Sequence, residues 1–492
     1  MNVGHTASAL TRFLCKVIVV ASIGLPVFAC PGVFGQTPSH RSPPLARQDG
    51  EVSTEVVVSQ LREAASLLQL GKLDEAEPIL RQVISVVPRN PDAHNLLGTI
   101  LDQRGKFNDA EQEYRLALRL NPNIISPLAN LGVLLARTGR SDEAVKAFET
   151  VLRKVPNHPQ ATLNLGLQYV ARGDYTRGAS LLKSASGLGL DSYQLQFNLG
   201  LASYNLKQYE EASTALESAA VFSPNSAEPL YYLGLVAWAQ GHDETAADFW
   251  DRAVELRPNF PEANFMLGEA LRRNRRTAAS VEFYQRALEQ DASKFVYYAR
   301  LGGVYIMLGR TDQAVEVFHH GVLRFPSLPA AHYFAGVAAR AAANYDTAAA
   351  ELRKALALEP RNVNALAQLG FVLLERDQMT EAEALLQRAT SINAKHFYAN
   401  YDLGRLLLRS RRYDQALLIL QHAARLKPSN PGVHYQLFMA LSRLKRKDEA
   451  EHELTIFKQL DEARKARPRG ETELEDEDVQ NPSASPLPSA PQ

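Results

Sequence analysis

Cysteine is almost missing from this chain of 492 residues. The only two, Cys15 and Cys30, lie close to the N-terminus, so the rest of the sequence can form neither a disulfide nor a cysteine nucleophile. The twelve histidines are scattered and show no HExxH or other metal-ligand spacing. The sequence therefore predicts no metal site.

Motifs that bind nucleotides or build an acyl-transfer site are also lacking. There is no phosphate loop and no GxSxG elbow, and Gly187-Leu188-Gly189 fails as a dinucleotide motif because Ser192 stands where the third glycine should be. Lysine plus arginine and aspartate plus glutamate number 54 each, without the basic excess typical of nucleic-acid binding. We expect a protein that is not an enzyme, has no catalytic residues, needs no cofactor and binds no nucleic acid.

What the sequence does contain is a strict period. Glycines recur every 34 residues without a slip in register, and a second small residue, most often alanine, follows twelve residues after each. A glycine inside a helix costs ~1 kcal/mol relative to alanine, so its recurrence indicates that a partner helix approaches closely. The glycines are Gly98, Gly132, Gly166, Gly200, Gly234, Gly268, Gly302, Gly336, Gly370 and Gly404.

Each period has the pattern of two helices. In residues 91–123 an apolar helical pattern ends near Gly105, a second one starts at Phe107, and Pro122 closes it. One face of the second pattern carries Ala110, Tyr114 and Ala117. The order leucine-glycine, alanine, aromatic, alanine and proline resembles the tetratricopeptide repeat, a unit of helix, turn and helix.

This resemblance implies an all-α fold, a right-handed superhelical solenoid of about twelve 34-residue repeats over residues 57–466. The first and last repeats are atypical, because Ala64 and Phe438 replace the glycine. The segment Glu451–Lys465 is expected to form the second helix of the last repeat, extended as a cap.

Residues 1–35 have the features of an export signal or an N-terminal anchor. Basic residues precede the uncharged, mostly apolar stretch Val17–Cys30, and small residues precede Gln36, before which we favour cleavage. Two other fates stay open: the stretch is retained as a membrane anchor, or Val27–Cys30 serves as a lipoprotein box. All three place the repeats in the periplasm or the cell envelope, with membrane association only through the N-terminal segment.

The segments that flank the repeats are not expected to fold. Residues 36–56 are rich in Pro, Ser, Gln and Arg, which predicts a flexible leader. Residues 467–492 are predicted to be a disordered tail, acidic at Glu471–Asp478 and rich in Pro and Ser beyond it.

The resemblance also points to a binding groove, because in this family the first helix of each repeat lines the concave face. With the glycine numbered as position 8, the groove positions are mainly 2, 5, 6, 9, 12 and 13. Position 5 carries an aromatic residue in six repeats, with Ala299 and Ala367 intervening, and position 12 adds two more. These rings either bind extended peptides or sugar rings or fill gaps between first helices. They are Phe197, Tyr204, Tyr231, Trp238, Phe265, Tyr333, Tyr401 and Tyr435.

Position 6 carries asparagine in three consecutive repeats, at Asn130, Asn164 and Asn198. An amide both donates and accepts hydrogen bonds, so a row of asparagines can bind a peptide backbone. The row resembles the asparagine ladder in the repeat domain of O-linked N-acetylglucosamine transferases. Asparagine is also a common residue of the repeat itself, so a purely structural role stays open.

Arginine is in modest excess at groove positions of the C-terminal half. Arginine beside aromatic residues favours acidic segments or acidic polysaccharides, although most such side chains are simply solvated. The acidic tail could itself bind there. The candidates are Arg272, Arg300, Arg340 and Arg405, together with Arg273, Arg409 and Arg443.

The sequence thus predicts a non-catalytic scaffold that binds an extended peptide or protein in its groove. Two alternatives stay open: a scaffold for exopolysaccharide export, and an architectural spacer. The oligomeric state is unknown. His94, His332 and His434 all fall at position 4, for which we expect structural roles.

Overall fold

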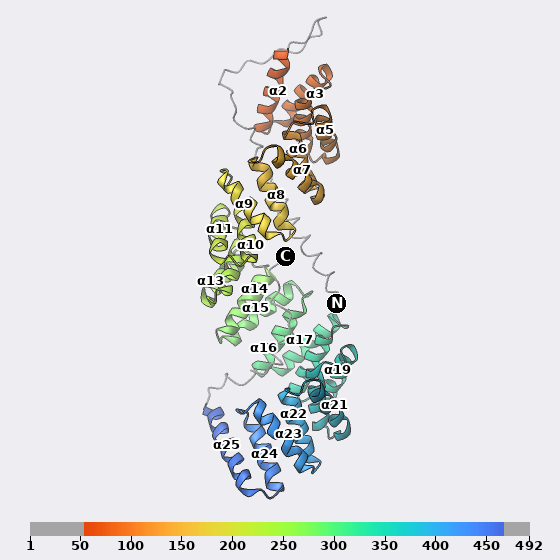
Figure 1. Ribbon diagram of the computed structural model, residues 1–492, viewed down its shortest axis with the longest axis vertical. Helices are drawn as coiled ribbons and strands as arrows, with labels where there is room; N and C mark the ends of the chain where they lie inside the picture. The colour runs from red at the N-terminus through yellow and green to blue at the C-terminus, as the bar shows by residue number, and fades with distance from the viewer. Residues whose placement is uncertain (1–53, 467–492) are drawn as a thin grey trace. The chain divides into compact units, whose positions relative to one another are not determined.

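The computed structural model describes residues 54–466, which contain 24 α-helices, α2 to α25, and no strand (Figure 1). The count matches the twelve predicted helix pairs. Helix α2 begins at Thr54, within the predicted leader. The expected export signal, the rest of the leader and the acidic tail lie outside the described residues.

The first compact unit extends to Gln240. It holds α2 (Thr54–Gln69), α3 (Leu73–Val86), α4 (Pro91–Gln103), α5 (Phe107–Leu120), α6 (Ser126–Arg137), α7 (Ser141–Lys154), α8 (Pro159–Ala171), α9 (Tyr175–Gly187), α10 (Tyr193–Asn205), α11 (Tyr209–Phe222) and α12 (Ala227–Ala239).

The second compact unit begins at Gly241. It holds α13 (Asp243–Leu256), α14 (Pro261–Arg273), α15 (Thr277–Gln290), α16 (Phe295–Met307), α17 (Thr311–Arg324), α18 (Pro329–Ala341), α19 (Tyr345–Leu358), α20 (Val363–Glu375), α21 (Met379–Ile392), α22 (Phe397–Arg409), α23 (Tyr413–Leu426), α24 (Pro431–Arg443) and α25 (Lys447–Ala466).

The periodic glycines lie where the two helices of a repeat cross. A Cβ atom on Gly98 would stand 2.8 Å from the ring of Tyr114, and one on Gly132 would stand 2.7 Å from Cε1 of Phe148. These second-helix residues are fully buried and follow their glycine by sixteen residues. The prediction that a partner helix explains the glycine period is confirmed at these positions.

A second periodic feature lies in the turn inside each repeat. Seven residues after position 8, the backbone is left-handed in all twelve repeats, with φ between +57° and +81°. In the first such turns the residue is glycine, for example Gly105, and the next amide, Lys106 N–H, donates to Leu101 O at 2.9 Å. This is a Schellman closure of the first helix. Six repeats place another residue there, such as Ala343 at φ +57°.

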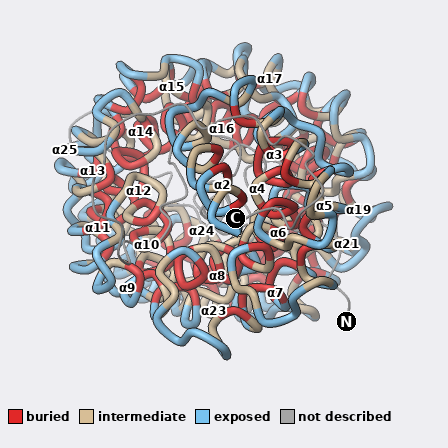
Figure 2. The backbone as a smooth tube through the Cα atoms, turned by 90° about the horizontal axis from the view of Figure 1, so that it is seen from above, coloured by how far each residue is buried: buried red, intermediate tan, exposed pale blue. Residues whose placement is uncertain are grey.

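The first helices are more deeply buried than the second helices. Figure 2 shows buried residues concentrated in first helices such as α4, α6, α8 and α10, and exposed ones in the turns and along second helices. Within each unit, first helices of adjacent repeats contact each other, as α6 does with α8 and α20 with α22. The first-helix surface of each unit is therefore a continuous face that spans several repeats.

The position 4 histidines connect a first helix to its surroundings. Nδ1 of His332 lies 2.6 Å from Oε2 of Glu351 on the second helix, and Nε2 donates to the carbonyl oxygen of Pro326, 2.9 Å away, in the preceding turn. The predicted structural role is confirmed, because the same two bonds recur in the other repeats with this histidine. They join His94 to Glu113 and Pro88, and His434 to Glu453 and Pro428.

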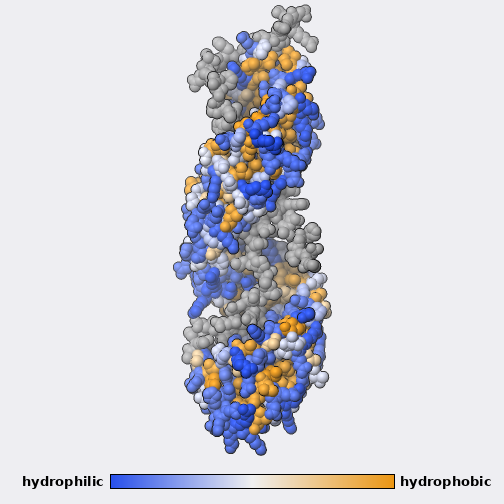
Figure 3. Space-filling view, viewed as in Figure 1, coloured by the Kyte–Doolittle hydropathy of each residue, from blue (hydrophilic) through white to orange (hydrophobic). Residues whose placement is uncertain are grey.

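The last helix forms the predicted cap. Helix α25 is 20 residues long, and its apolar residues Leu454, Phe457 and Leu460 are half-buried. No helix among the described residues is long and apolar enough to cross a bilayer. Polar residues cover most of the face seen in Figure 3, with smaller apolar patches between them.

Candidate functional site

Four of the predicted groove aromatics are part of the core. Tyr231 is 1% exposed, Phe265 is fully buried, and Phe197 and Tyr333 are also buried. Their rings fill space between helices: the centroid of Phe265, for example, lies 5.0 Å from that of Tyr297 on the next first helix. Rings buried to this extent cannot stack on a ligand. At these positions the gap-filling alternative describes the packing.

The other four predicted aromatics remain accessible. Tyr204, Trp238 and Tyr401 are half-buried, and Tyr435 is 40% exposed. Tyr204 and Trp238 lie in the first unit, whereas Tyr401 and Tyr435 lie on α22 and α24 of the second. A binding role for these four side chains stays a prediction.

The three asparagines do not share one arrangement. Asn130 donates from Nδ2 to Oδ1 of Asn95 at 3.1 Å and so joins α6 to α4. Asn164 and Asn198 each donate to a carbonyl of the preceding turn of their own helix, 2.8 Å away. Asn130 and Asn164 are half-buried, and Asn198 is buried. Asn130 Nδ2 also donates to Thr99 Oγ1 at 3.4 Å, whereas Asn164 and Asn198 each use one N–H, and the predicted ladder stays a prediction.

Arg272 and Arg300 surround a buried carboxylate. Glu269 on α14 is 2% exposed and accepts a hydrogen bond from the Tyr284 hydroxyl at 2.6 Å. Nη2 of Arg272 lies 3.2 Å from Oε2 of Glu269, and Nε of Arg300 lies 2.9 Å from Oε1. Burial, with Glu269 beside it, raises the pKa of Tyr284 well above its usual range. These two arginines compensate an internal charge, so they are weaker candidates for a ligand.

Arg405 lies at the centre of a second charged cluster, on α18, α20 and α22. Its Nη1 donates to Oδ1 of Asp402 at 2.9 Å, and its Nη2 donates to Oε1 of Glu375 at 2.7 Å. The guanidinium carbon also lies 5.6 Å from the ring centroid of Phe371 and 5.8 Å from that of Tyr401. These contacts fix the Arg405 side chain on the first-helix face.

Arg340 approaches the same ring from α18. Its guanidinium carbon lies 5.4 Å from the centroid of Phe371. No carboxylate among the described residues forms an ion pair with Arg340, and its buried Nε–H has no hydrogen-bond partner there. Phe371, Arg340 and Arg405 are all half-buried, so the cluster is partly open to solvent.

The negative charge of this cluster depends on pH. Burial raises the pKa of Asp402 to about 6, although Arg405 and Arg340 oppose the shift. Arg409 adds a further cation: its Nη1 donates to Leu374 O at 2.8 Å, and Nη2 lies 3.9 Å from Glu375. Three guanidinium groups thus face two carboxylates, one of which becomes neutral in mild acid.

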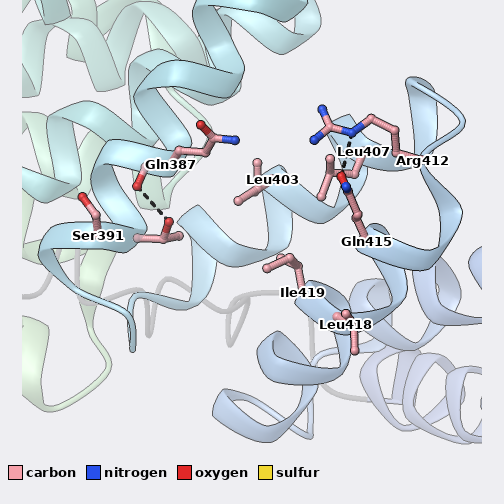
Figure 4. Close-up of a pocket in the computed structure, with 9 residues that line it drawn as sticks. Gln387, Ser391, Leu403, Leu407, Arg412, Gln415, Leu418 and Ile419 are labelled. Carbon is pink, nitrogen blue, oxygen red and sulfur yellow. Dashed lines mark hydrogen bonds between the residues drawn. The ribbon is translucent and has the colours of Figure 1, made fainter.

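A hollow of about 510 Å³ opens on the opposite, second-helix side of the same region (Figure 4). Leu403 and Leu407 of α22 form its floor, Gln387 and Ser391 lie on α21, and Leu418 belongs to α23. Sequence reasoning missed this hollow, because attention to groove positions excludes the second helices. Within the described residues, no group of three or more His, Cys, Asp or Glu side chains is placed to hold a metal ion.

Family profiles match the chain over most of its repeats. A tetratricopeptide repeat profile matches residues 61–123, 130–185 and 163–227, and the profile of the Cilia and flagella-associated protein 70 C-terminal domain matches residues 257–474. No curated protein sequence matched the chain.

Solved structures similar to the chain include other repeat proteins. The APC/C hetero-tetramer Cut9-Hcn1 is 15% identical, with 83% of this chain and 94% of that chain covered and a TM-score of 0.41. Yeast Tom70 is 14% identical, with 84% and 96% covered and a TM-score of 0.33. YrrB, titled a TPR protein with an unusual peptide-binding site, is 18% identical, with 37% and 95% covered and a TM-score of 0.35.

Repeats of this kind are generally non-catalytic scaffolds for protein interactions. The twelve helix pairs, their 34-residue period, the glycine contacts and the profile matches agree. The chain belongs to the tetratricopeptide repeat family.

Proposed function

We propose that this protein is a non-catalytic scaffold that binds an extended peptide segment of a partner protein on its first-helix face. The observation that carries the proposal is the cluster on α18, α20 and α22. There, Arg340 and Arg405 converge on Phe371, beside the half-buried ring of Tyr401. Aromatic rings offer contact area at low entropic cost, and arginine binds carboxylates through forked hydrogen bonds.

The cluster is preorganised for such binding. Arg405 already pairs with Asp402 and Glu375, so its contribution is to hold the ring of Phe371 in place rather than to offer its own charge to a ligand. Arg340 has no ion partner among the described residues and offers its charge to a ligand. We infer that the preferred peptide carries acidic residues next to apolar ones.

We also propose that the scaffold acts outside the cytoplasm, in the periplasm or the cell envelope. This rests on residues 1–35, whose apolar stretch Val17–Cys30 is typical of an export signal. Mass spectrometry of the intact protein from cells would test it. Loss of the first 35 residues is expected, whereas a full-length, cytoplasmic chain would refute export.

Photocrosslinking in intact cells tests the binding function. A photoreactive phenylalanine analogue would replace Tyr435, which is 40% exposed on first helix α24, and captured molecules would be identified by mass spectrometry. The matched control replaces Leu323, which is 65% exposed on second helix α17. A protein captured from Tyr435 and not from Leu323 supports the scaffold. A polysaccharide adduct would move the function to glycan handling, and no specific adduct would favour a spacer.

A further inference from the structure

Charge is segregated along the C-terminal part of the chain. Residues 395–469 hold sixteen lysines and arginines but eight aspartates and glutamates. Residues 470–492 hold six acidic residues and no basic one, and all six fall within Glu471–Asp478. Opposite charges of this size in neighbouring parts of one molecule attract each other strongly at low ionic strength.

Four groove arginines, one on α18 and three within the basic part, form what we call the cationic face: Arg340, Arg405, Arg409 and Arg443. Only Arg405 and Arg409 have a carboxylate within 4 Å among the described residues, and they share Glu375. Arg443 on α24 is exposed, and Arg340 contacts Phe371 and forms no ion pair within 4 Å among the described residues, although its charge acts on the pKa of Asp402. Two of the four arginines on this face can therefore form ion pairs with the carboxylates of a ligand.

The acidic segment is long enough to reach this face. Arg340 and Arg405 converge on α20, two first-helix spacings of about 10 Å from α24. The end of α25 lies up to about 20 Å away along the helix direction, so the path is roughly 30 Å. Glu471 and Asp478 follow Ala466 by five and twelve residues, which span at most about 17 and 42 Å when extended. The later half of the segment can cover the distance.

We propose that Glu471–Asp478 binds the cationic face of the same molecule and competes there with the partner peptide. The proposal rests on the proposed function, because both ligands use the first-helix face. Glu471 and Glu473 are within reach of Arg443 on α24, while the later carboxylates, Glu475–Asp478, pair with Arg340 beside the ring of Phe371. The tail then acts as a built-in competitor that only sufficiently acidic or abundant partners displace.

The strength of this competition follows from the tether. A short flexible linker gives an effective concentration of about 1 mM. If the isolated segment binds with a Kd of about 100 μM, the tethered segment weakens any competing ligand about tenfold. Higher salt would reduce the effect, because the contacts are between exposed charges.

The experiment uses the full chain in two forms, wild type and a neutral-tail variant in which amides replace the six acidic side chains. The probe is a fluorescein-labelled synthetic peptide of residues 470–480, followed by fluorescence anisotropy at low salt. The neutral-tail variant is expected to bind the peptide at least tenfold more tightly than wild type. Its substitutions are Glu471→Gln, Glu473→Gln, Glu475→Gln, Asp476→Asn, Glu477→Gln and Asp478→Asn.

Two single variants in the neutral-tail background locate the site. Arg340→Gln should weaken peptide binding at least fivefold. Arg425→Gln removes the same charge from an exposed position on second helix α23 and should change binding less than twofold. Thermal unfolding of each variant verifies that the fold is retained.

Three results would overturn the proposal. They are the absence of peptide binding by the neutral-tail variant, equal peptide affinity of the wild type and the neutral-tail variant, and equal effects of Arg340→Gln and Arg425→Gln on peptide affinity. Sedimentation of wild type that depends on concentration would assign the tail to a second copy and also overturn it. The Tyr435 crosslink separates this proposal from the scaffold function. Partner capture without peptide binding refutes only the tail contact, and the reverse refutes only the scaffold.

Discussion

Replacing Gly302 with alanine should destabilise the helix pair α16 and α17. The added Cβ would overlap Cε2 and Cζ of Phe318 and would stand 2.9 Å from its Cδ2. Phe318 cannot move aside easily, because it is fully buried and stacked on Phe334 with centroids 5.5 Å apart. The methyl group therefore has to displace a packed ring.

Two opposing terms set the size of the effect. Alanine gains about 1 kcal/mol over glycine in a helix interior, whereas forcing an extra methyl into a filled core costs about 1–3 kcal/mol. The net change is a loss of up to about 2 kcal/mol. Gly321 on α17 is the matched control in the same pair, because its Cβ would meet no atom closer than 3.4 Å. Gly321→Ala should therefore stabilise by about 1 kcal/mol.

Hydrogen exchange of the amides of α16 and α17 is the suitable assay, because repeat arrays open locally rather than all at once. Gly302→Ala should speed exchange by up to about 30-fold, and Gly321→Ala should slow it. Gly166→Ala should lie between them, since its Cβ would meet the more flexible Leu182 at 3.0 Å. Slower exchange in Gly302→Ala would refute the explanation of the glycine period.

Further expectations follow from the turns, the histidines and the buried acid. Gly309→Ala should cost about 1 kcal/mol by thermal unfolding although its Cβ would meet nothing within 4 Å, because φ is +72°; Gly309→Asn should cost less, and equal costs would contradict this. His332→Ala should lose about 2 kcal/mol by leaving the carbonyl of Pro326 and the carboxylate of Glu351 without it; His332→Asn should lose about half, since Asn400 at the same position keeps the carbonyl bond. The pKa of Asp402 is raised to about 6, so the folded state binds its proton more tightly, and the penalty of burying the charge decreases as pH falls through 6 and is gone below the unfolded value of 3.8. Asp402→Asn should therefore be more stable than wild type at pH 7.5, by a margin that shrinks at pH 5 in urea titrations, and a difference independent of pH would refute the raised pKa.

Features that lie within one repeat could be predicted from the sequence, and features between repeats could not. The glycine and the side chain that covers it belong to the same repeat, so their spacing recurs and is visible in the sequence. The depth of a position 5 ring depends on its neighbours instead. Phe265 is covered by Tyr297 of the next repeat, whereas Tyr435 is exposed on α24, the first helix of the last repeat.

The candidate site was predicted in part for the same reason. The pair Asp402 and Arg405 is three residues apart on one helix, but the bond from Arg405 to Glu375 spans thirty residues and joins different groove positions. Which arginine pairs with which carboxylate depends on side-chain length and on the rotation between first helices. The sequence therefore predicted the arginines, but only the structure shows which of them form ion pairs within the protein.

The location of each glycine and its covering side chain within one repeat has a consequence for how such chains change in length. A duplication or deletion of 34 residues adds or removes a glycine together with the side chain that packs against it, as with Gly98 and Tyr114 or Gly132 and Phe148. Recombination between similar repeats thus leaves every helix pair internally complete wherever the break falls between pairs. Array length can then change by whole repeats without disturbing the packing inside any helix pair.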